Sequence, residues 1–426
     1  MYWKMVQGWF SALFHRVWRR GLMRSGMVTG LLLAIVVLGL GVAYRERGRG
    51  NLHKLKAKIE TPQRAELKVP RPGGKEAITL MRTRLEGDPT PEFLSATMLP
   101  GRGMNVLQIA AYIPGRGEVN LLASPSVGDA EHAMSGKGED TAGLASLTMG
   151  GAFEVPWAGG IWGTPAQTAD HVTVTWRSHA MTLPVATGGM VAGGGLLLET
   201  PADSAGTTAM PDGGDAQATF RAGDFGAHWP SKTEVTVAML LSSRSIELTV
   251  TARNTGDVAE PIGIGWRPRF AVLDGRRQQM RLRIPGQMRA VRDRATGQPS
   301  GVLVPVAGTP YDFNASGGAG LGQMELDDSF TDLHQELLDS GPVAELSDPA
   351  NGFGLRLTAL SPTIKTMRVV APASGDFVTI DPEFNYDDPL GREWGEDTGM
   401  VVLQPGQTTQ WKVRLEIYSL SDAGSM

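Results

Sequence analysis

The hydrophobic pattern divides the chain into a helical N-terminus and a strand-rich remainder. From about residue 70 onward, short runs rich in Val, Leu, Ile and Thr alternate apolar with polar positions, as in 233–241 and 245–253. A period of two is typical of half-buried antiparallel strands. Further runs of this kind are 105–113, 171–177, 353–359, 376–381 and 410–418. We therefore expect residues 76–426 to form an all-β body of stacked antiparallel sheets.

Two long stretches interrupt the strand pattern. Residues 124–150 and 199–224 are rich in Gly, Ala, Ser, Asp and Thr, and they are predicted to be loops or mobile insertions. The whole chain of 426 residues contains 55 glycines and 27 prolines, which is consistent with many tight turns between short strands.

An uncharged run near the N-terminus predicts a membrane anchor. Residues 27–44 carry no charge over eighteen positions, and Arg24 and Arg45 bracket them. As a helix this run spans about 27 Å, which is enough for the hydrocarbon core of a bilayer. We predict a single transmembrane helix over 25–45. A cleaved signal peptide and a buried core helix are the alternatives.

The charge distribution sets the N-terminus apart from the body. Residues 1–58 carry eleven Lys and Arg against one acid, whereas the remainder is acidic. Residues 1–24 repeat apolar positions at helical spacing, which predicts a basic amphipathic helix on an anionic membrane surface, or one packed on the body. Residues 46–75 form a basic linker. We expect a single-pass protein of a bacterial inner membrane with a periplasmic body, and an acidic body argues against nucleic-acid binding.

Common catalytic and metal-binding patterns are missing from the sequence. The absence of cysteine excludes a disulfide scaffold, a thiol nucleophile and Cys-ligated metals. There is no Walker loop, no HExxH and no GxSxG, and no histidine pair has metal-ligand spacing. We expect neither a cofactor nor a metal. Asp381, Glu383, Asn385 and Asp387 alternate as at the start of a calcium loop, but we interpret them as a solvated acidic loop, with a calcium site as the alternative.

Several motifs resemble the aldose 1-epimerase (galactose mutarotase) superfamily over about residues 95–420. Residues 155–161 read VPWAGGI, residues 254–270 contain NTG followed by PIGIGWRPRF, Asp381 precedes a proline, and residues 403–407 read LQPGQ. The resemblance implies a β-sandwich of the supersandwich type with a sugar cleft on one concave face.

The same resemblance implies a site with substitutions. The family's carboxylate base falls on Asp381. Its catalytic histidine and neighbouring tyrosine fall on Arg267 and Arg269, its second histidine on Gly194, and its pocket arginine on Gly160. Arginine keeps its proton at physiological pH, so Arg267 polarises a ring oxygen more readily than it donates a proton to it. We therefore expect weak or altered mutarotase activity.

Other side chains are candidates for contacts with a sugar. Aromatic rings stack on pyranose faces, carboxylates accept hydrogen bonds from hydroxyls, and a histidine elsewhere could replace the missing acid. The candidates for these three roles are Trp157 and Trp266, Asp327 and Asp328, and His179 and His228. Core packing of the tryptophans, a turn cap at the aspartates and ordinary strand positions for the histidines are the alternatives.

Three functional hypotheses follow. The first is a membrane-anchored protein that binds a sugar or polysaccharide. The second is an active aldose or hexose-phosphate 1-epimerase with Asp381 as base, and the third is a non-catalytic docking subunit of an envelope polysaccharide system. Arg267 and Arg269 alternate along one strand and should share a face, which suits an anionic sugar. An internal carboxylate such as Asp381 is the other possible partner of these arginines.

Overall fold

The computed structural model describes residues 30–45, 69–84, 87–293, 295–315, 317–395 and 397–420. The chain divides into two units, Met1–Val69 and Pro70–Met426. Within the first unit, residues 30–45 form a helix. Among the described residues, no helix combines the length and the apolar character that crossing a membrane requires. The amphipathic helix predicted for 1–24 and most of the linker predicted for 46–75 lie outside the described residues.

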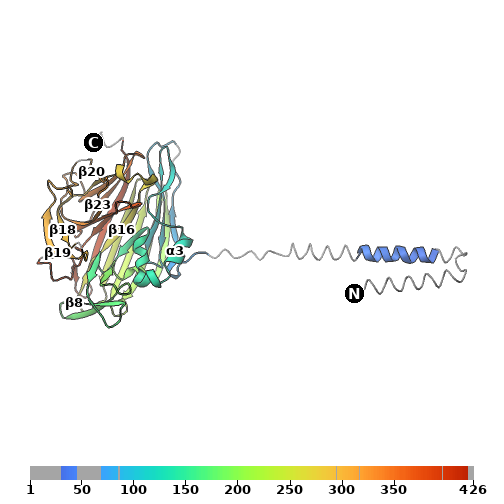
Figure 1. Cartoon of the computed structure of the whole chain (residues 1–426), viewed down its shortest axis with the longest axis horizontal. Helices are drawn as coiled ribbons and strands as arrows, with labels where there is room; N and C mark the ends of the chain where they lie inside the picture. The colour runs from blue at the N-terminus through green and yellow to red at the C-terminus, as the bar shows by residue number, and fades with distance from the viewer. Residues whose placement is uncertain are drawn as a thin grey trace. The chain divides into compact units, whose positions relative to one another are not determined.

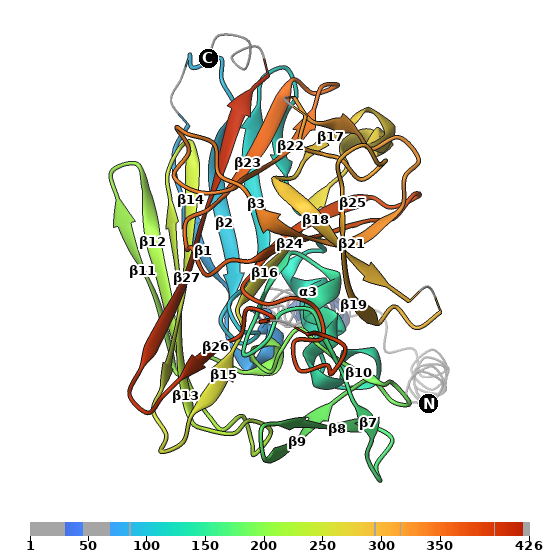
Figure 2. The same cartoon turned by 90° about the vertical axis from the view of Figure 1, so that its left-hand side faces the viewer.

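Two large sheets build the second unit (Figure 1, Figure 2). The eleven-stranded sheet runs in the order β1-β2-β3-β5-β16-β25-β24-β21-β18-β19, with β4 paired to β3. The strands of this sheet are β1 (Ile78–Met81), β2 (Glu92–Leu99), β3 (Asn105–Ile113), β4 (Gly117–Asn120), β5 (Gly151–Glu154), β16 (Gly265–Ala271), β18 (Gly286–Arg292), β19 (Pro299–Pro305), β21 (Leu326–Leu333), β24 (Thr366–Ala371) and β25 (Phe377–Glu383).

The nine-stranded sheet has the order β11-β12-β13-β14-β27-β23-β22-β17-β20. The strands of this sheet are β11 (Ser204–Met210), β12 (Gly213–Gly223), β13 (Thr233–Leu241), β14 (Ser245–Asn254), β17 (Arg281–Arg283), β20 (Ala319–Gly320), β22 (Val343–Asp348), β23 (Phe353–Ala359) and β27 (Thr408–Ser419). Pairing in both sheets is antiparallel, so the predicted all-β class is confirmed.

One hydrophobic core joins the two large sheets. Trp411 of β27 packs edge-on against Phe153 of β5, with ring centroids 6.4 Å apart, and Trp266 of β16 stacks on the same phenylalanine at 6.5 Å. The Trp411 indole N–H donates a hydrogen bond of 3.0 Å to the carbonyl of Pro382 in β25. Because side chains alternate along a strand, the apolar residues of each strand lie on the face that packs in this core. The polar side chains of β16 and β25 lie on the opposite face.

Smaller elements cover one end of the body. β7 (Thr164–Pro165), β8 (His171–Trp176) and β9 (His179–Pro184) form a three-stranded sheet, and β6 (Gly160–Trp162) pairs with β10 (Val191–Gly193). Figure 2 shows β7, β8, β9 and β10 near one another at this end. A second core lies here, in which Trp157 stacks on Trp229 with ring centroids 5.3 Å apart. A further two-stranded sheet pairs β15 (Glu260–Ile262) with β26 (Val401–Leu403).

The helical segments of the body are short. α3 (Val127–Ala133) begins after Ser126, whose hydroxyl accepts a hydrogen bond from the backbone N–H of Asp129. The 3₁₀ segments are η2 (Pro72–Gly74), η3 (Gly138–Thr148), η4 (Leu197–Glu199), η5 (Leu273–Gly275) and η6 (Arg277–Gln279). Residues 124–150, predicted as a loop, therefore contain α3 and η3.

The loop prediction for 199–224 is wrong. These residues contain the β11–β12 hairpin, in which Ser204 pairs with Thr219 and Met210 with Gly213. All seven residues of β11 are exposed. An edge strand with two solvated faces has no need of apolar alternation, so its sequence of small residues gave no strand pattern.

Candidate functional site

A row of charged side chains crosses the eleven-stranded sheet on the face that points away from the core between the two sheets, here called the outer face. In β16, Trp266 and Phe270 point into the core, and Arg267 and Arg269 point to the other face because side chains alternate along a strand. In the neighbouring β25, Val378 and Ile380 are core residues. The alternation therefore places Asp381 and Glu383 on the same outer face as the arginines.

Strand register brings two arginines to either side of Asp381. Arg368 of β24 is the direct cross-strand partner of Asp381. On the other side, Gly265 pairs with Glu383 and Arg269 with Thr379, so Arg267 lies opposite Asp381. The Arg267 Nε atom is 3.7 Å from Asp381 Oδ2, and its Nη1 atom is 3.6 Å from Glu154 Oε1.

Three buried carboxyl groups lie in this row. Glu154, Asp381 and Glu383 are each at most 1% exposed. Gly265 lies between the two glutamates in the register, and a Cβ there would be 3.1 Å from Glu383 Cγ and 3.7 Å from Glu154 Oε2. The glycine therefore lets the two glutamates approach each other over its backbone. Neither oxygen of Asp381 nor of Glu383 has a hydrogen-bond partner among the described residues.

Burial raises the pKa of all three carboxyl groups. Burial is the largest cause at Asp381, and although Arg267 opposes it, the pKa reaches about 7. Burial also raises the pKa of Glu383 well above its usual value, and the neighbouring Glu154 and Asp381 add to this effect. The pKa of Glu154 is raised by burial and partly restored by Arg267. Burial therefore favours the protonated form of these carboxyl groups, and Arg267 offsets it only in part.

A cavity of about 310 Å³ opens above this row. This volume is at the lower end of the usual range for small-molecule sites. Its charged and aromatic lining consists of Arg267, Arg292, Arg368, Asp327, Asp387 and Trp162. We call it the Arg267 cavity. Asp381 does not line it, because this carboxyl group is buried against Arg267 and only 1% exposed.

The guanidinium groups of the Arg267 cavity differ in how they are held. Arg292 Nη1 lies 2.6 Å from Asp387 Oδ2. Arg368 donates two hydrogen bonds, of 3.0 and 2.8 Å, to Asp327 Oδ1. Burial alone would lower the pKa of Arg368, but Asp387 and Asp327 outweigh it and hold this pKa above its usual value. By contrast, Arg267 is held by longer ion pairs, of 3.7 Å to Asp381 Oδ2 and 3.6 Å to Glu154 Oε1.

The segment after β5 closes one side of the cavity. The backbone N–H of Gly160 donates a 2.5 Å hydrogen bond to Asp387 Oδ1, and that of Gly159 donates one of 2.8 Å to Glu154 Oε2. Gly159 has φ +71°, and a Cβ there would lie 2.4 Å from Asp387 Oδ1. A Cβ at Gly160 would lie 2.7 Å from Val191 Cγ1. A side chain at 160, where the resemblance places an arginine, is thus unfavourable, and Arg292 and Arg368 line the cavity instead.

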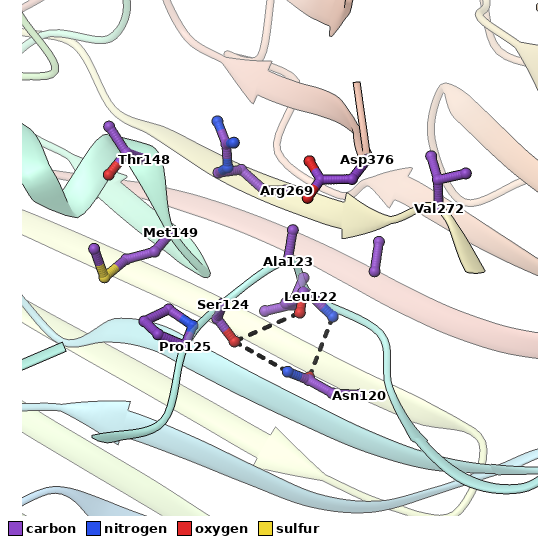
Figure 3. Close-up of a pocket in the computed structure, with 11 residues that line it drawn as sticks. Asn120, Leu122, Ala123, Ser124, Pro125, Thr148, Met149, Arg269, Val272 and Asp376 are labelled. Carbon is purple, nitrogen blue, oxygen red and sulfur yellow. Dashed lines mark hydrogen bonds between the residues drawn. The ribbon is translucent and has the colours of Figure 1, made fainter. Parts of the chain in front are cut away.

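A second cavity lies farther along β16 (Figure 3). It measures about 520 Å³, and its lining includes Arg269, Asp376, Asn120 and Ser124. The guanidinium carbon of Arg269 lies 3.4 Å from the ring centroid of Phe377. Burial lowers the pKa of Arg269, and the nearby Arg267 lowers it further. The two arginines thus share a face, as the alternation predicts, but they line separate cavities.

Several predicted sugar contacts lie elsewhere. Trp157 and Trp266 are at most 1% exposed, and their indole N–H groups donate to the carbonyls of Ala192 and Gly151, so both rings pack in a core. Asp328 is on the opposite face of β21 from Asp327 and forms an ion pair with Arg289 at 2.6 Å. Core packing explains the tryptophans, and strand alternation separates the two aspartates.

His179 belongs to β9 of the small sheet, His228 lies in the loop between β12 and β13, and neither lines a cavity described above. The Nδ1–H group of His228 donates a hydrogen bond to the carbonyl of Thr182, and its ring stacks on His171 with centroids 5.7 Å apart. His179 is exposed beside Trp176, with ring centroids 6.4 Å apart. Among the described residues, no cluster of His, Cys, Asp or Glu is arranged to hold a metal ion.

The predicted solvated acidic loop is wrong. Asp381, Glu383, Asn385 and Asp387 are all at most 1% exposed. The Asn385 side chain accepts from the backbone N–H of Ala158 and donates to its carbonyl, at 3.1 and 2.9 Å. This segment therefore fixes the loop after β5.

Sequence reasoning missed Arg292 and Arg368 as lining residues. Neither arginine lies in a motif, and each reaches the cavity only because β18 and β24 belong to the same sheet as β16. The sequence did mark Asp387 as a candidate, since this residue belongs to the alternating acidic run.

Comparisons with known proteins agree with this architecture. Residues 212–416 match the protein-family model described as aldose 1-epimerase. No curated protein sequence matches the chain. A galactose mutarotase-like protein from Clostridium acetobutylicum superposes with a TM-score of 0.61 at 13% identity, covering 80% of this chain and 98% of that chain. A galactose 1-epimerase from Lactobacillus acidophilus gives 0.54 at 15% identity, covering 81% and 99%. These likenesses show the galactose mutarotase-like fold, as the sequence predicts.

Proposed function

The chain is related to the aldose 1-epimerases through residues 212–416 and through its fold, and from this premise we propose that it binds a sugar in the Arg267 cavity. One observation carries the proposal. The cavity is lined by guanidinium and carboxylate groups around Arg267, whose ion pairs with Asp381 and Glu154 are long, at 3.7 and 3.6 Å. A guanidinium group without a short internal partner is available to a ligand oxygen in the cavity, because charged hydrogen bonds to oxygen anions are strong.

The lining suits a polyhydroxylated ligand. Sugar hydroxyls both donate and accept hydrogen bonds, and Asp327 and Asp387 offer acceptors where Arg267, Arg292 and Arg368 offer donors. Trp162 adds an aromatic surface to the lining. Because guanidinium forks match carboxylates and phosphates, a uronic acid or a sugar phosphate is the preferred form of the ligand.

We further propose that anomer interconversion is slow. The family mechanism implied by the resemblance needs a base and an acid at the sugar ring. Asp381 is separated from the cavity by Arg267, and an arginine retains its proton at neutral pH. In this proposal Asp381 acts as a positioning residue for Arg267.

One observation favours the alternative of an active epimerase. The pKa of Asp381 is raised to about 7 by burial, and a general base works best with a pKa near the working pH. This alternative requires Arg267 to move and expose the carboxylate. In polarimetry with glucose and galactose, it predicts fast mutarotation that Asp381→Asn abolishes, whereas the binding proposal predicts rates close to the uncatalysed reaction for both proteins.

Isothermal titration with galactose, galacturonate and glucose 6-phosphate tests the binding proposal. We expect the anionic sugars to bind more tightly than galactose, and Arg267→Ala to weaken them about tenfold or more, since a charged hydrogen bond contributes about 1.5–3 kcal/mol. Arg253→Ala, at an exposed position of β14, is the matched control and should bind as the wild type does. Equal affinities of the wild type and Arg267→Ala for every sugar would refute the proposal.

We also propose that residues 25–45 anchor the protein in a bacterial inner membrane, with the body in the periplasm. The motive is the uncharged run 27–44 and its flanking arginines. Digestion of the body by protease added to intact spheroplasts would support this topology. Protection of the body, or a mature chain that begins near Tyr44, would overturn it.

A further inference from the structure

A third cavity adjoins the Arg267 cavity. It measures about 630 Å³ and shares Trp162 with its smaller neighbour. The two linings also come from neighbouring positions in the sequence. In three pairs of consecutive residues, one residue lines one cavity and the next residue lines the other. These pairs are Met190 with Val191, Gly297 with Gln298, and Asp387 with Asp388. The two cavities therefore lie on either side of the same chain segments, with Trp162 in both linings.

The lining of the third cavity is polar and offers both donors and acceptors. It includes the hydroxyls of Thr164, Thr173 and Thr175 from the small sheet, with Arg177 and Arg392 nearby. Thr173 and Thr175 are exposed on β8, and they alternate with the buried Val172 and Val174. A row of hydroxyls beside guanidinium groups is chemistry that recognises a second sugar unit.

Asp388 organises the boundary between the cavities. Its Oδ1 atom accepts a 3.0 Å hydrogen bond from the backbone N–H of Trp162, and its Oδ2 atom accepts one of 3.1 Å from Gln298. Next to it, Asp387 accepts from Gly160 and pairs with Arg292 in the Arg267 cavity. Through these hydrogen bonds, the two adjacent carboxyl groups fix the backbone at Gly160 and Trp162, next to both cavities. We call the third cavity the Asp388 cavity.

We propose that the ligand is an oligosaccharide, with one sugar unit in the Arg267 cavity and the next in the Asp388 cavity across Trp162. The proposal rests on the proposed function and names its substrate class. A monosaccharide would fill only the smaller cavity, whereas a disaccharide would also bury hydroxyls against β8. A partly exposed tryptophan at the junction offers an aromatic face to the linkage region.

Affinity as a function of chain length tests the proposal. The probes are glucose with maltose and cellobiose, and galacturonic acid with digalacturonic acid, titrated calorimetrically into the full-length protein. We expect at least one disaccharide to bind about tenfold more tightly than its monosaccharide. Thr175→Trp, which fills the Asp388 cavity, should remove this gain and leave monosaccharide affinity unchanged.

A matched variant and three outcomes make the test decisive. Thr249→Trp on β14, which lines neither cavity, should retain the gain. If monosaccharides bind through Arg267 but no disaccharide binds more tightly, or if Thr175→Trp keeps the gain, the oligosaccharide inference fails and the proposed function stands. If no sugar binds at all, both fail.

Discussion

At the scale of single residues, burial and charge act on Asp381 in opposite directions. Burial disfavours its charged form, and Arg267 at 3.7 Å favours it. Burial prevails, since the pKa rises from an ordinary value of 3.8 to about 7. For an acid with a folded-state pKa above its unfolded value, the stability contributed by the protonated group is complete below about pH 4 and declines as the pH rises through 7.

Asp381→Asn should therefore stabilise the protein at alkaline pH. We expect a higher melting temperature than that of the wild type at pH 8, and a much smaller difference at pH 4, near which the stability from the protonated wild-type carboxyl is almost complete. Thermal unfolding followed by circular dichroism at both pH values measures this. The control is Asp376→Asn at an exposed position. A lower melting temperature of Asp381→Asn at pH 8 would mean that its pairing with Arg267 outweighs its burial.

At the scale of elements, the loop after β5 is held by glycine geometry. Gly159 combines a left-handed φ of +71° with a position where a Cβ would be 2.4 Å from Asp387 Oδ1. Gly115 has a similar φ of +78° but open space around it. The pair therefore separates backbone strain, which both share, from the contact with Asp387, which only Gly159 makes.

Gly159→Ala should destabilise the protein more than Gly115→Ala. Backbone strain contributes about 1 kcal/mol or more in both variants, and displacement of Asp387 adds to it in the first. Chemical denaturation of the two variants and the wild type gives the difference in unfolding free energy. We also expect Gly159→Ala alone to weaken sugar binding, because Asp387 lines the Arg267 cavity. Equal losses of stability would show that the loop adapts to the added methyl group.

The elements also show what the sequence could predict. The apolar alternation at 233–241 placed β13 at its observed bounds, because this strand buries one face in the core and leaves the other partly exposed. Arg267 and Arg269 were correctly expected on one face. The approach of Arg292 and Arg368 to Arg267 depends on the strand order β16-β25-β24-β21-β18, which joins segments far apart in the chain. Local patterns carry no information about that order.

At the scale of the whole molecule, the principal core belongs entirely to the second unit. Its buried residues run from Leu80 to Ile417 and include the aromatic contacts between the two large sheets. The smaller cores that contain Trp157 and Leu107 also lie within Pro70–Met426. Since burial of apolar surface is the main source of folding free energy, this unit contains what it needs to fold alone.

A protein that consists of residues 70–426 should therefore unfold cooperatively and bind sugars as the full chain does. The expected result is one sharp thermal transition within about 4 °C of that of the full-length protein, since 1 kcal/mol shifts the melting temperature by about 2–4 °C in a domain of 150–250 residues and by less in a larger one. The measurements are circular dichroism and the galacturonate titration. Every lining residue of the Arg267 cavity lies between Leu147 and Asp387 and is therefore present in the shortened protein. Its affinity for galacturonate should not change. A broad transition, or loss of galacturonate binding with the fold intact, would show that residues 1–69 contribute to the body or to its site.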